Sequence, residues 1–505
     1  MVHDGPKEAC GVFGVYAPGL SAAFLTFDGL YALQHRGQES AGMAVSDGQR
    51  LWIDKDMGLV TNVFNDYKLT TLQGHLAIGH TRYSTTGSST WRNAQPAYRE
   101  VGDAGFALGH NGNLTNTSRL VAEAGMLPGI VASDSDLVAE LVAASFGSDD
   151  ELRSDGRDLE TALLQVLPRL EGAFSFVLCD VAHLIGLRDP NGFRPLCLGR
   201  LDAGGWVLAS ETPALDVVGA HFVRELDPGE MVIIDANGCR SLRPFDADRV
   251  DPKLCIFEFV YFARPDSRLY GKEVHGARQR MGELLAEQSP PPPDHVDPPR
   301  PVLVMGVPDS GVPAAEGFAR RAGLPYGQGL VKNRYIGRTF IAPNQNARAV
   351  GVRRKLNPLR DSIAGKRLVV VDDSIVRGTT TKALVRMLRE AGAAEVHLRI
   401  SSPPYRWPCF YGMDTGTRAE LIAANLSVSE IQDFVGADSL AFVSLDNLVA
   451  AIDAPGAGFC TACLTGVYPV PVPITLHKGV LEVTGDELVE MDSAPEGGVP
   501  EGAHG

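Results

Sequence analysis

The residues best suited to chemistry in the first half of the chain begin with Cys10, in the run Cys-Gly-Val-Phe-Gly. Polar clusters then end or open apolar stretches at residues 34–40, 80–85, 110–114 and 133–136. Each cluster also has an ordinary structural interpretation, because Ser133 can cap a helix and Asn111-Gly112 can form a turn. Together, a thiol, an arginine, an amide and carboxylates supply the groups that acyl transfer from an amide requires.

A second chemical pattern occupies residues 367–381, which read RLVVVDDSIVRGTTT. An apolar strand ends in Asp372-Asp373, and a loop of small residues then enters a helix. Such a loop presents backbone N–H groups and hydroxyls to a phosphate, aided by the helix N-terminus. The paired aspartates suit a ribose diol or a hydrated magnesium ion. The Gly-x-x-x-x-Gly-Lys pattern of a P-loop is absent.

Four of the eight cysteines follow the first half of the chain, namely Cys255, Cys409, Cys460 and Cys463. The Cys-x-x-Cys pair at 460–463 suits a redox pair, half of a zinc site or half of a cluster site. The four spacings match no short regular metal motif. Sequence spacing alone therefore does not select an iron–sulfur cluster over zinc or over four unmetallated thiols.

Two different patterns of secondary structure must position these groups. Residues 11–240 contain short strand-like runs broken by glycine and a few helical patterns, which indicates an α+β layered domain. From residue 301, continuous apolar strands alternate with helix-compatible stretches, which predicts a parallel α/β sheet that binds ligands at the carboxyl ends of its strands.

The predicted strands lie at 11–17, 40–45, 75–81, 106–110, 174–179, 231–235, 302–307, 367–372 and 395–400, and the predicted helices at 22–34, 135–145, 160–170, 271–288, 313–322 and 379–391. The proline-rich residues 290–301 exclude a helix or a central strand. Residues 480–505 contain seven acidic residues and no lysine or arginine, which predicts a disordered tail.

The composition narrows the class of protein. The 505 residues carry a net charge of −15, which argues against a nucleic-acid or anionic-membrane partner but allows a local basic pocket. No apolar run reaches ~18 residues, so no membrane span is expected. The start, MVHDGPKEAC, lacks the apolar core of a signal peptide. We therefore expect a cytoplasmic multidomain protein whose sparse cysteines serve catalysis or metal binding.

In their order behind Cys10, the first clusters closely resemble the N-terminal-nucleophile glutamine amidotransferases, over residues 10 to about 240. The resemblance implies an αββα sandwich and a propeptide, residues 1–9, that is cleaved after Ala9. A freed Cys10 would supply both the thiol nucleophile and, as the base, an α-amine with an ordinary pKa of ~7.7–8.0. The resemblance also implies that Arg82 holds the glutamine carboxylate, that Asp134 holds its α-ammonium, and that Asn111 and Gly112 form the oxyanion hole.

The segment at 367–381 closely resembles the signature of the type I phosphoribosyltransferases. The resemblance implies magnesium ligands at Ser310, Asp372 and Asp373. Residues 332–340 resemble the mobile loop that closes over the substrate in that family, and residues 353–355 add cations for the pyrophosphate. The implied residues for binding 5-phosphoribosyl 1-pyrophosphate are Asp372, Asp373, Ser374, Arg377, Gly378, Thr379, Thr380, Lys332, Tyr335 and Lys355.

The contexts of the four later cysteines resemble the cluster-bearing branch of the amidophosphoribosyltransferases, which implies a structural 4Fe–4S cluster. The combined resemblance covers about residues 10–475, with a glutaminase domain at 10–240 and a phosphoribosyltransferase domain with the cluster-ligand region at 241–479. It implies that glutamine is hydrolysed at Cys10. Ammonia would then pass internally to displace pyrophosphate and give 5-phosphoribosylamine, the first committed step of purine biosynthesis. It also implies a homotetramer and inhibition by purine nucleotides.

Two other functions fit part of the pattern. An amidotransferase such as a glucosamine-phosphate synthase would share the glutaminase half, but the segment at 372–381 argues against it. A non-catalytic purine-sensing repressor would need a DNA-binding module and a basic face, and neither is evident in a chain of charge −15. A repressor would also leave Cys10 and Arg82 unexplained.

Overall fold

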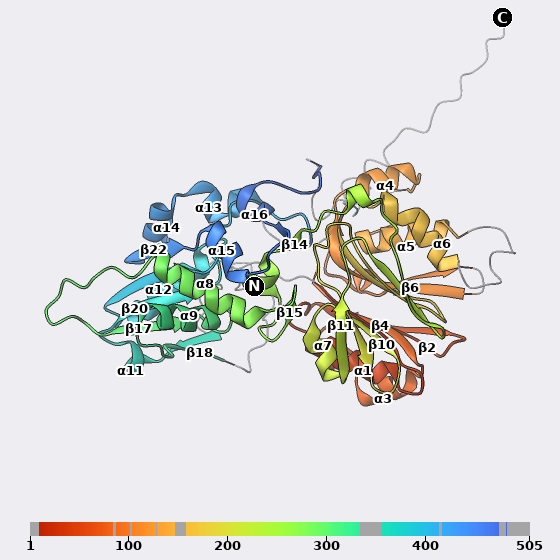
Figure 1. The fold of residues 1–505 in the computed structure, drawn as a ribbon, viewed down its shortest axis with the longest axis horizontal. Helices are drawn as coiled ribbons and strands as arrows, with labels where there is room; N and C mark the ends of the chain where they lie inside the picture. The colour runs from red at the N-terminus through yellow and green to blue at the C-terminus, as the bar shows by residue number, and fades with distance from the viewer. Residues whose placement is uncertain are drawn as a thin grey trace, which may run out of the picture.

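The computed structural model describes residues 10–83, 87–101, 104–127, 129–146, 158–333, 355–413, 417–473 and 481. Two lobes lie side by side in Figure 1. The first lobe, coloured red to yellow-green, contains the antiparallel sheets, and the second, green to blue, contains the parallel sheet. None of the helices in these ranges is long and apolar enough to cross a membrane.

The first lobe is built on two antiparallel sheets. In the described part of the chain, one sheet has the strand order β11-β9-β10-β1-β4-β2-β3 and the other β13-β12-β8-β7-β6-β5. The strands of the first sheet are β1 Gly11–Tyr16, β2 Ser40–Ser46, β3 Leu51–Met57, β4 Leu76–Arg82, β9 Cys197–Leu201, β10 Trp206–Ala209 and β11 Ala220–Glu225. Those of the second are β5 Ala97–Val101, β6 Ala104–Leu114, β7 Gly172–Cys179, β8 Leu184–Arg188, β12 Met231–Asp235 and β13 Gly238–Leu242.

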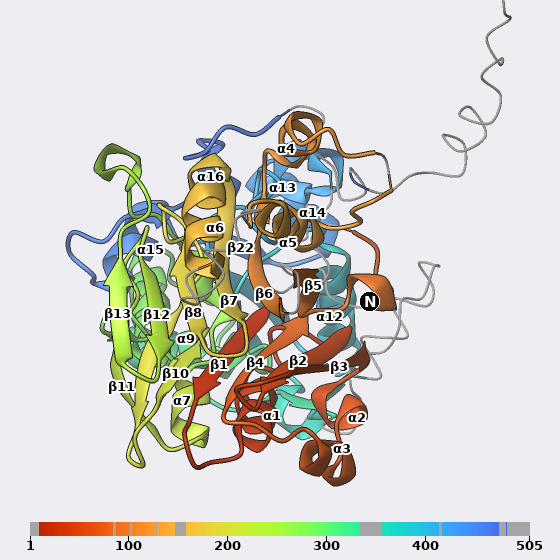
Figure 2. The same cartoon turned by 90° about the vertical axis from the view of Figure 1, so that its right-hand side faces the viewer.

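Helices cover the outer face of each sheet (Figure 2). Those packed on the first sheet are α1 Ala22–Ala32, α2 Val60–Val63, α3 Asp66–Thr71 and α7 Thr212–Val217. Those packed on the second are α4 Thr117–Glu123, α5 Asp134–Ala144 and α6 Asp158–Val166, with short 3-10 turns η1 Trp91–Asn93, η3 Leu167–Arg169 and η4 Ala247–Arg249 nearby in the lobe. Apolar side chains from both sheets, such as Val12 and Val177, form the core between them. This is the predicted αββα sandwich.

Burial on two faces explains why the central strands look unlike ordinary antiparallel strands in the sequence. Every residue of β1, β2, β4 and β7 is buried, because helices cover one face and the other sheet covers the other. These strands therefore form continuous apolar runs rather than an alternating pattern. Gly29 lets α1 approach closely, since a Cβ there would lie 2.3 Å from the ring of Phe13.

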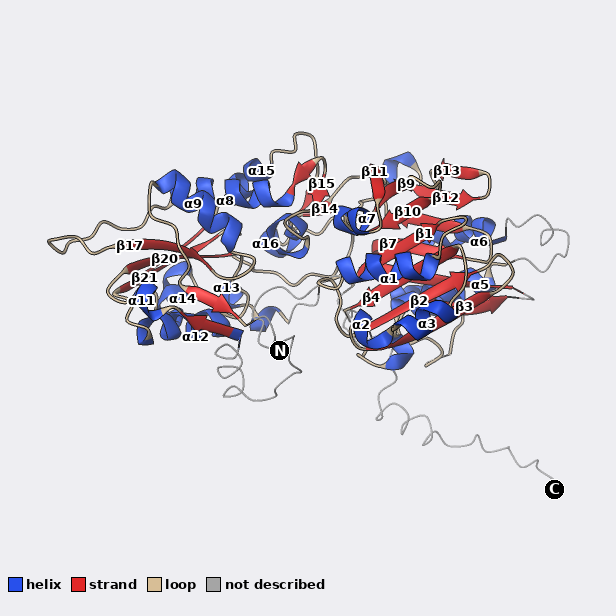
Figure 3. Cartoon of the chain, turned by 90° about the horizontal axis from the view of Figure 1, so that it is seen from below, coloured by secondary structure: helices blue, strands red, loops and turns tan. Residues whose placement is uncertain are grey.

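The second lobe is built on a parallel sheet of order β17-β20-β21-β22 in the described residues. Its strands are β17 Val302–Gly306, β20 Arg367–Asp372, β21 Glu395–Ile400 and β22 Ser439–Phe442. One face carries α8 Val274–Gln288, α9 Val312–Ala322 and α15 Leu445–Ile452, and the other carries α11 Arg360–Ile363, α12 Thr379–Glu390, α13 Ile422–Asn425 and α14 Val428–Val435. Figure 3 shows this division, with α8 and α9 on one side of the strands and α12 and α14 on the other.

Short elements complete the second lobe. They are β14 Leu254–Cys255 paired with β23 Phe459–Cys460, β15 Arg268–Leu269 paired with β16 Lys272–Glu273, β18 Leu330–Lys332 paired with β19 Leu356–Pro358, the π-helical turn η5 Glu258–Phe262, the turn η6 Arg418–Glu420 and α16 Ala462–Thr465. Residues 290–301 contain no helix or strand, as their prolines predicted.

Several element boundaries differ from those predicted from sequence; the strand predicted at 106–110, for example, runs from Ala104 to Leu114. The helix predicted from residue 271 begins at Val274, because the preceding residues turn back in the β15–β16 hairpin. Helix α6 ends at Val166, where Pro168 enters a separate 3-10 turn. Strand β13 runs to Leu242, beyond the predicted limit of the first domain at residue 240.

Helices α8 and α9 pack through two glycines, which yields a test of the second lobe. A Cβ on Gly282 would lie 1.8 Å from the Ala314 carbonyl oxygen, and one on Gly317 would lie 1.9 Å from that of Gln279. We expect Gly282→Ala to destabilise the fold by about 1–3 kcal/mol, through forced separation of the helices. Thermal unfolding would show a lowered midpoint.

Gly276→Ala is the matched control, because Gly276 lies on the same helix and its nearest neighbour would be 3.5 Å away, at Arg280 Nη1. This change should leave the midpoint unchanged or raise it, since alanine stabilises a helix by about 1 kcal/mol relative to glycine. Equal midpoints for the two variants would contradict the close packing of α8 on α9.

Candidate functional site

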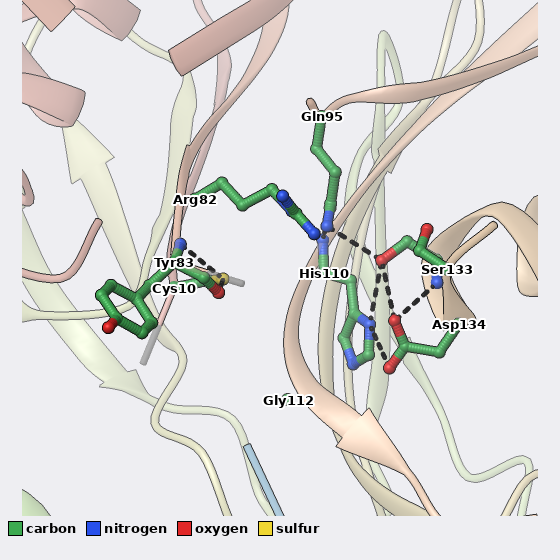
Figure 4. Close-up of a pocket in the computed structure, with 9 residues that line it drawn as sticks. Cys10, Arg82, Tyr83, Gln95, His110, Gly112, Ser133 and Asp134 are labelled. Carbon is green, nitrogen blue, oxygen red and sulfur yellow. Dashed lines mark hydrogen bonds and ion pairs between the residues drawn. The ribbon is translucent and has the colours of Figure 1, made fainter. Parts of the chain in front are cut away.

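A pocket opens in the first lobe where strands from both sheets meet the start of α5 (Figure 4). Its lining includes four residues predicted from sequence, Cys10, Arg82, Gly112 and Asp134. Cys10 precedes β1, Arg82 ends β4, Gly112 lies on β6 and Asp134 opens α5. Ser133 is the N-cap of that helix and accepts a hydrogen bond from the Asp136 N–H, at 3.2 Å. The fold therefore brings together groups from four separate segments.

The thiol of Cys10 is buried beside Tyr83. Its Sγ donates to the Tyr83 carbonyl oxygen at 3.2 Å and accepts from the Tyr83 N–H at 3.4 Å. Burial raises the pKa of the thiol to about 11, against a smaller lowering influence of Arg82. A thiol of that pKa stays protonated at neutral pH, so it reacts as a nucleophile only when a base removes its proton.

Two opposite charges lie across the pocket from each other. Burial alone would raise the pKa of Asp134, but His110 and the N–H groups of Leu114 and Ser135 hold it below its usual value. Those two N–H donors lie 3.2 and 2.8 Å from the carboxylate oxygens. The Arg82 side chain is 3% exposed and donates to the Ser88 carbonyl oxygen at 3.1 Å. The pocket thus holds a buried carboxylate and a buried guanidinium, as a zwitterionic substrate requires.

The two predicted oxyanion-hole residues differ in their placement. Gly112 lines the pocket, and a Cβ there would lie 2.0 Å from the Ala173 carbonyl oxygen, so only glycine fits. Asn111 is fully buried and does not belong to the lining. Neither its Nδ2 nor its Oδ1 has a hydrogen-bond partner within the described part of the chain. An unpaired buried amide costs about 1–3 kcal/mol, which a hydrogen bond to a ligand would recover.

Five lining residues were not predicted as site residues from sequence, namely Tyr83, Gln95, His110, Ser133 and Ser135. Gln95 accepts a hydrogen bond from the His110 N–H at 2.7 Å, and its Nε2 lies 2.9 Å from Ser135 Oγ. The same hydroxyl lies 3.2 Å from His110 Nδ1. These linked hydrogen bonds orient the Asp134 carboxylate. His110 and Ser135 adjoin predicted residues and could have been included with them, whereas nothing near Gln95 marks it as a site residue.

The second predicted site lies at the carboxyl ends of β17 and β20. Asp373 accepts hydrogen bonds from Ser310 Oγ and Ser374 Oγ, both at 2.5 Å. The Asp372 carboxylate accepts from the Asp373 N–H at 3.0 Å. Burial, followed by the neighbouring charge, raises the pKa of Asp372, and burial also raises that of Asp373. The predicted magnesium ligands Ser310, Asp372 and Asp373 are therefore adjacent, in a setting that favours a bound cation.

The loop from Asp373 leads into α12 as predicted, with Gly378 at its N-cap. Gly378 has φ 75°, and a Cβ there would lie 2.6 Å from Ile422 Cδ1, so glycine is required. Thr379 and Thr380 form the first turn of α12. The guanidinium of Arg377 pairs with the Glu420 carboxylate at 2.6 Å.

The base of the predicted mobile loop is formed by β18 and β19. Lys332 ends β18 and its Nζ lies 2.5 Å from the Asp309 carboxylate. Lys355 lies across from it, since its carbonyl oxygen accepts from the Asn333 N–H at 2.8 Å. Tyr335 and the cations predicted at 353 and 354 lie outside the described residues, as do the propeptide 1–9 and nearly all of the predicted tail 480–505.

The four later cysteines gather between the two lobes. Cys255 on β14 pairs in parallel register with Cys460 on β23, and Cys463 lies on α16. Burial raises the pKa of Cys463, and so do Cys409, Cys255 and Cys460, so the four sulfurs share one electrostatic environment. No three His, Cys, Asp or Glu side chains in the described ranges converge tightly enough to hold a single metal ion.

Buried ion pairs join the first lobe to the start of the second. Glu258, on η5, contacts Arg36 Nη2 at 2.6 Å and Arg194 Nη1 at 3.2 Å. Glu211 contacts Arg36 Nε at 3.2 Å and accepts from Ser267 Oγ at 2.5 Å. All four charged side chains are almost completely buried.

Comparisons with known proteins agree with this architecture. A family model described as a glutamine amidotransferase domain matches residues 80–217, and one described as a phosphoribosyl transferase domain matches residues 294–401. The amidophosphoribosyltransferase of Mycobacterium tuberculosis is 52% identical over 494 residues, covering 95% of this chain and 90% of its own. That of Synechococcus elongatus is 50% identical over 485 residues, covering 95% and 94%.

A solved structure is similar over the same extent. The glutamine phosphoribosylpyrophosphate amidotransferase from Bacillus subtilis, complexed with ADP and GMP, has a TM-score of 0.82 and 43% identity. The match covers 93% of this chain and 99% of that one. The fold and the two family domains define an enzyme that joins a glutamine amidotransferase to a phosphoribosyltransferase. The chain belongs to the amidophosphoribosyltransferase family. The predicted fold class, enzyme class and place at the first step of purine biosynthesis are thereby confirmed.

The buried carboxylate of Glu211 generates a prediction about pH. Burial alone would raise its pKa, but His35, Arg36 and Ser267 hold it far below its usual value. Because the folded-state pKa lies below the unfolded value of ~4.3, the stabilisation is present above that pH and is lost on acidification. Glu211→Gln should cost about 3 kcal/mol at neutral pH. Denaturant titrations should show that this deficit is constant from about pH 7 to about pH 5 and shrinks as the pH is lowered further to about pH 3.5.

Asp202→Asn serves as the control, because Asp202 pairs with His221 at the surface, where its side chain is 83% exposed. That variant should differ little from the wild type at either pH. A deficit for Glu211→Gln that stays constant across the titration would contradict the ionised, paired state of Glu211.

Proposed function

We propose that the first-lobe pocket hydrolyses glutamine, with Cys10 as nucleophile. Arg82 binds the α-carboxylate of glutamine and Asp134 binds its α-ammonium, which directs the side-chain amide toward the thiol. The convergence of Cys10, Arg82 and Asp134 in one buried pocket is the observation that supports this proposal most directly. The high pKa of the thiol explains why the site needs a base.

The base is the α-amine that Cys10 acquires when residues 1–9 are removed. It takes the thiol proton as the sulfur attacks the amide carbon, and it returns the proton to the departing ammonia. The N–H of Gly112 and the Nδ2 of Asn111 donate to the oxyanion that forms. The buried, unpaired amide of Asn111 supports this role, because the tetrahedral intermediate would satisfy it. Water then hydrolyses the thioester to glutamate.

We further propose that the ammonia passes through the interior to the second lobe, because in neutral water most of it would become ammonium and lose its nucleophilic lone pair. There it displaces pyrophosphate from the anomeric carbon of 5-phosphoribosyl 1-pyrophosphate and gives 5-phosphoribosylamine. The loop at 374–380 binds the 5-phosphate through its N–H groups and hydroxyls. Lys332 and Lys355 neutralise the pyrophosphate as it leaves, and Tyr335 helps to bind 5-phosphoribosyl 1-pyrophosphate.

Mg²⁺ fits the donor set at the second site. Ser310, Asp372 and Asp373 would hold it, and their adjacent oxygens supply the hard ligands that this ion prefers. When bound, Mg²⁺ supplies charge neutralisation for the pyrophosphate. The carboxylates themselves orient the ribose hydroxyls.

A 4Fe–4S cluster fits the four cysteines. Four thiolates are the usual ligands of such a cluster, and Cys255, Cys409, Cys460 and Cys463 share one region between the lobes. They come from segments that are far apart in the chain, so the group would join the domain junction at Cys255 to the C-terminal region and serve stability. Zinc and unmetallated thiols are the alternatives.

The proposals about regulation and assembly are drawn from the family resemblance. The Bacillus subtilis relative was solved with ADP and GMP, and we propose that purine nucleotides inhibit this enzyme as well. The homotetramer and the cytoplasmic location stay predictions. A glucosamine-phosphate synthase is excluded by the matched phosphoribosyl transferase domain.

Cys10→Ala tests the two-site scheme. We expect loss of glutamine-dependent phosphoribosylamine formation, by at least a thousandfold, because no nucleophile remains. Activity with high concentrations of ammonium salt should stay within about twofold, since the second lobe is unchanged. Intact-mass measurement should show wild-type enzyme beginning at Cys10 and the variant retaining residues 1–9.

Cys197→Ala is the control, because Cys197 is equally buried but lies on β9 outside the pocket. It should retain both activities. Full glutamine-dependent activity of Cys10→Ala, or of wild-type enzyme that keeps residues 1–9, would overturn the proposed mechanism.

Metal analysis tests the four-cysteine centre. Protein purified without oxygen should be brown and contain about four iron and four sulfide per chain, as a 4Fe–4S cluster requires. Cys463→Ser should lower the iron content and the thermal unfolding midpoint together, whereas Cys179→Ser, in the core of the first lobe, should not lower the iron content. One zinc per chain, or no metal, would contradict the cluster.

A further inference from the structure

The loop that carries Cys409 packs directly against the strand that carries Asn111 and Gly112. A Cβ built on Gly412 would lie 3.0 Å from both the Cα and the carbonyl carbon of Gly112, so the two backbones are in contact. One residue further along β6, Asn113 Nδ2 donates to the Phe410 carbonyl oxygen at 3.0 Å. The segment 409–412 of the second lobe therefore forms a wall behind the oxyanion hole of the first.

The same segment is fixed to the first lobe by two further contacts. The ring of Tyr411 stacks on that of Phe193, with centroids 4.4 Å apart and planes at 16°. The buried guanidinium of Arg194 donates to the Tyr411 carbonyl oxygen through Nε at 3.1 Å and Nη2 at 2.8 Å. Ala173, which pairs with Asn113 in the sheet, belongs to the same apolar cluster as Tyr411.

On its other side, the segment is anchored in the cysteine region. The Tyr411 N–H points to Cys409 Sγ at 3.4 Å, and the Tyr411 hydroxyl donates to the Val470 carbonyl oxygen at 2.5 Å. Cys460 and Ala462 lie in the apolar cluster that includes Tyr411. Segment 409–412 thus links the four-cysteine centre to the strand of the oxyanion hole through contacts that are buried or partly buried.

We propose that segment 409–412 is a positioning element for glutamine hydrolysis: it holds β6 so that the donors of Asn111 and Gly112 point at the developing oxyanion. Asn113 is the positioning residue that joins the strand to the segment. The glutaminase centre is then complete only when the cysteine region of the second lobe is docked. This inference rests on the proposed oxyanion-hole roles of Asn111 and Gly112.

The proposal predicts a specific kinetic signature. Arg82 and Asp134, which bind glutamine, lie on β4 and α5, and the Asp134 carboxylate meets β6 at the Leu114 N–H rather than at Asn111 or Gly112. Misaligned oxyanion donors therefore weaken the transition state and leave substrate binding intact, so that kcat falls while KM stays constant. Loss of one such donor typically costs 10²–10³-fold, and displacement of the donors should cost about tenfold or more.

Asn113→Leu tests this signature, because leucine keeps the volume and removes the bond to Phe410. We expect the kcat of glutamine hydrolysis to fall at least tenfold, with KM and ammonia-dependent activity within about twofold of wild type. Binding of glutamate γ-semialdehyde, whose adduct with the Cys10 thiol places an oxyanion in the hole, should weaken by the same factor as kcat. Asn116→Leu is the matched control, since Asn116 is also buried after β6 but bonds to Arg169 instead.

An unchanged kcat for Asn113→Leu, or a higher KM with unchanged aldehyde binding, would overturn the positioning role. If Asn113→Leu does not fold, Phe193→Leu weakens the same contact from the Tyr411 side, and kcat should fall at least threefold with constant KM. Cys10→Ala and Asn111→Ala are measured alongside. If both retain glutamine hydrolysis, the proposed site itself fails; if both lose it while the positioning variants do not, only the present inference fails.

Discussion

A buried cluster of charges at the junction of the lobes is the interaction on which the rest of the structure depends. Glu258 opens the turn that leads into the second lobe and is enclosed by Arg36 and Arg194 of the first. Its side chain is completely buried. A charge in that position is stable only when its partners remain, and removal of one partner of such a pair costs about 3–5 kcal/mol. The ion pairs therefore hold the lobes in one relative position.

Each arginine of this junction also lies in, or contacts, a segment that packs near one of the candidate sites. Arg36 belongs to the turn after α1, where a Cβ on the next residue, Gly37, would lie within 2.6 Å of the Thr81–Arg82 backbone. Arg194 donates both to Glu258 and to the Tyr411 carbonyl oxygen. The same charges that join the lobes thus support β4, which carries Arg82, on one side and the cysteine region on the other.

The two lobes position their polar groups in different ways. In the first, complete burial of the central strands forces polar side chains to the strand ends, where the pocket forms between two sheets. In the second, the parallel strands β17 and β20 end side by side, so Ser310 and Asp373 meet without any contribution from distant loops. The first site requires four separate segments to pack together, whereas the second requires only two adjacent strand ends.

Much of this molecule was predictable from local sequence. The continuous apolar runs predicted β17, β20 and β21 within one residue, and residues 367–381 carried their phosphate-binding pattern in one stretch, because strand, loop and helix are neighbours in the chain. Cys10, Arg82 and Asp134 were recognisable because each stands in a distinctive short cluster. The start of α8 and the end of α6 could not be predicted from local sequence. The helical patterns extend further there, but a hairpin precedes α8 and a turn containing proline follows α6.

The tertiary structure decided what no local pattern encodes. The orphaned amide of Asn111, the inclusion of Gln95 in the pocket and the burial of Glu258 each depend on which distant segments pack together. Asn113 and Phe410 are 297 positions apart, yet they share a hydrogen bond. The sequence by itself determined which groups are available for the proposed chemistry, since those groups are specified by residue type. Only the tertiary structure determined how β6 of the first lobe packs against the cysteine region, because that contact exists only once both lobes are folded and docked.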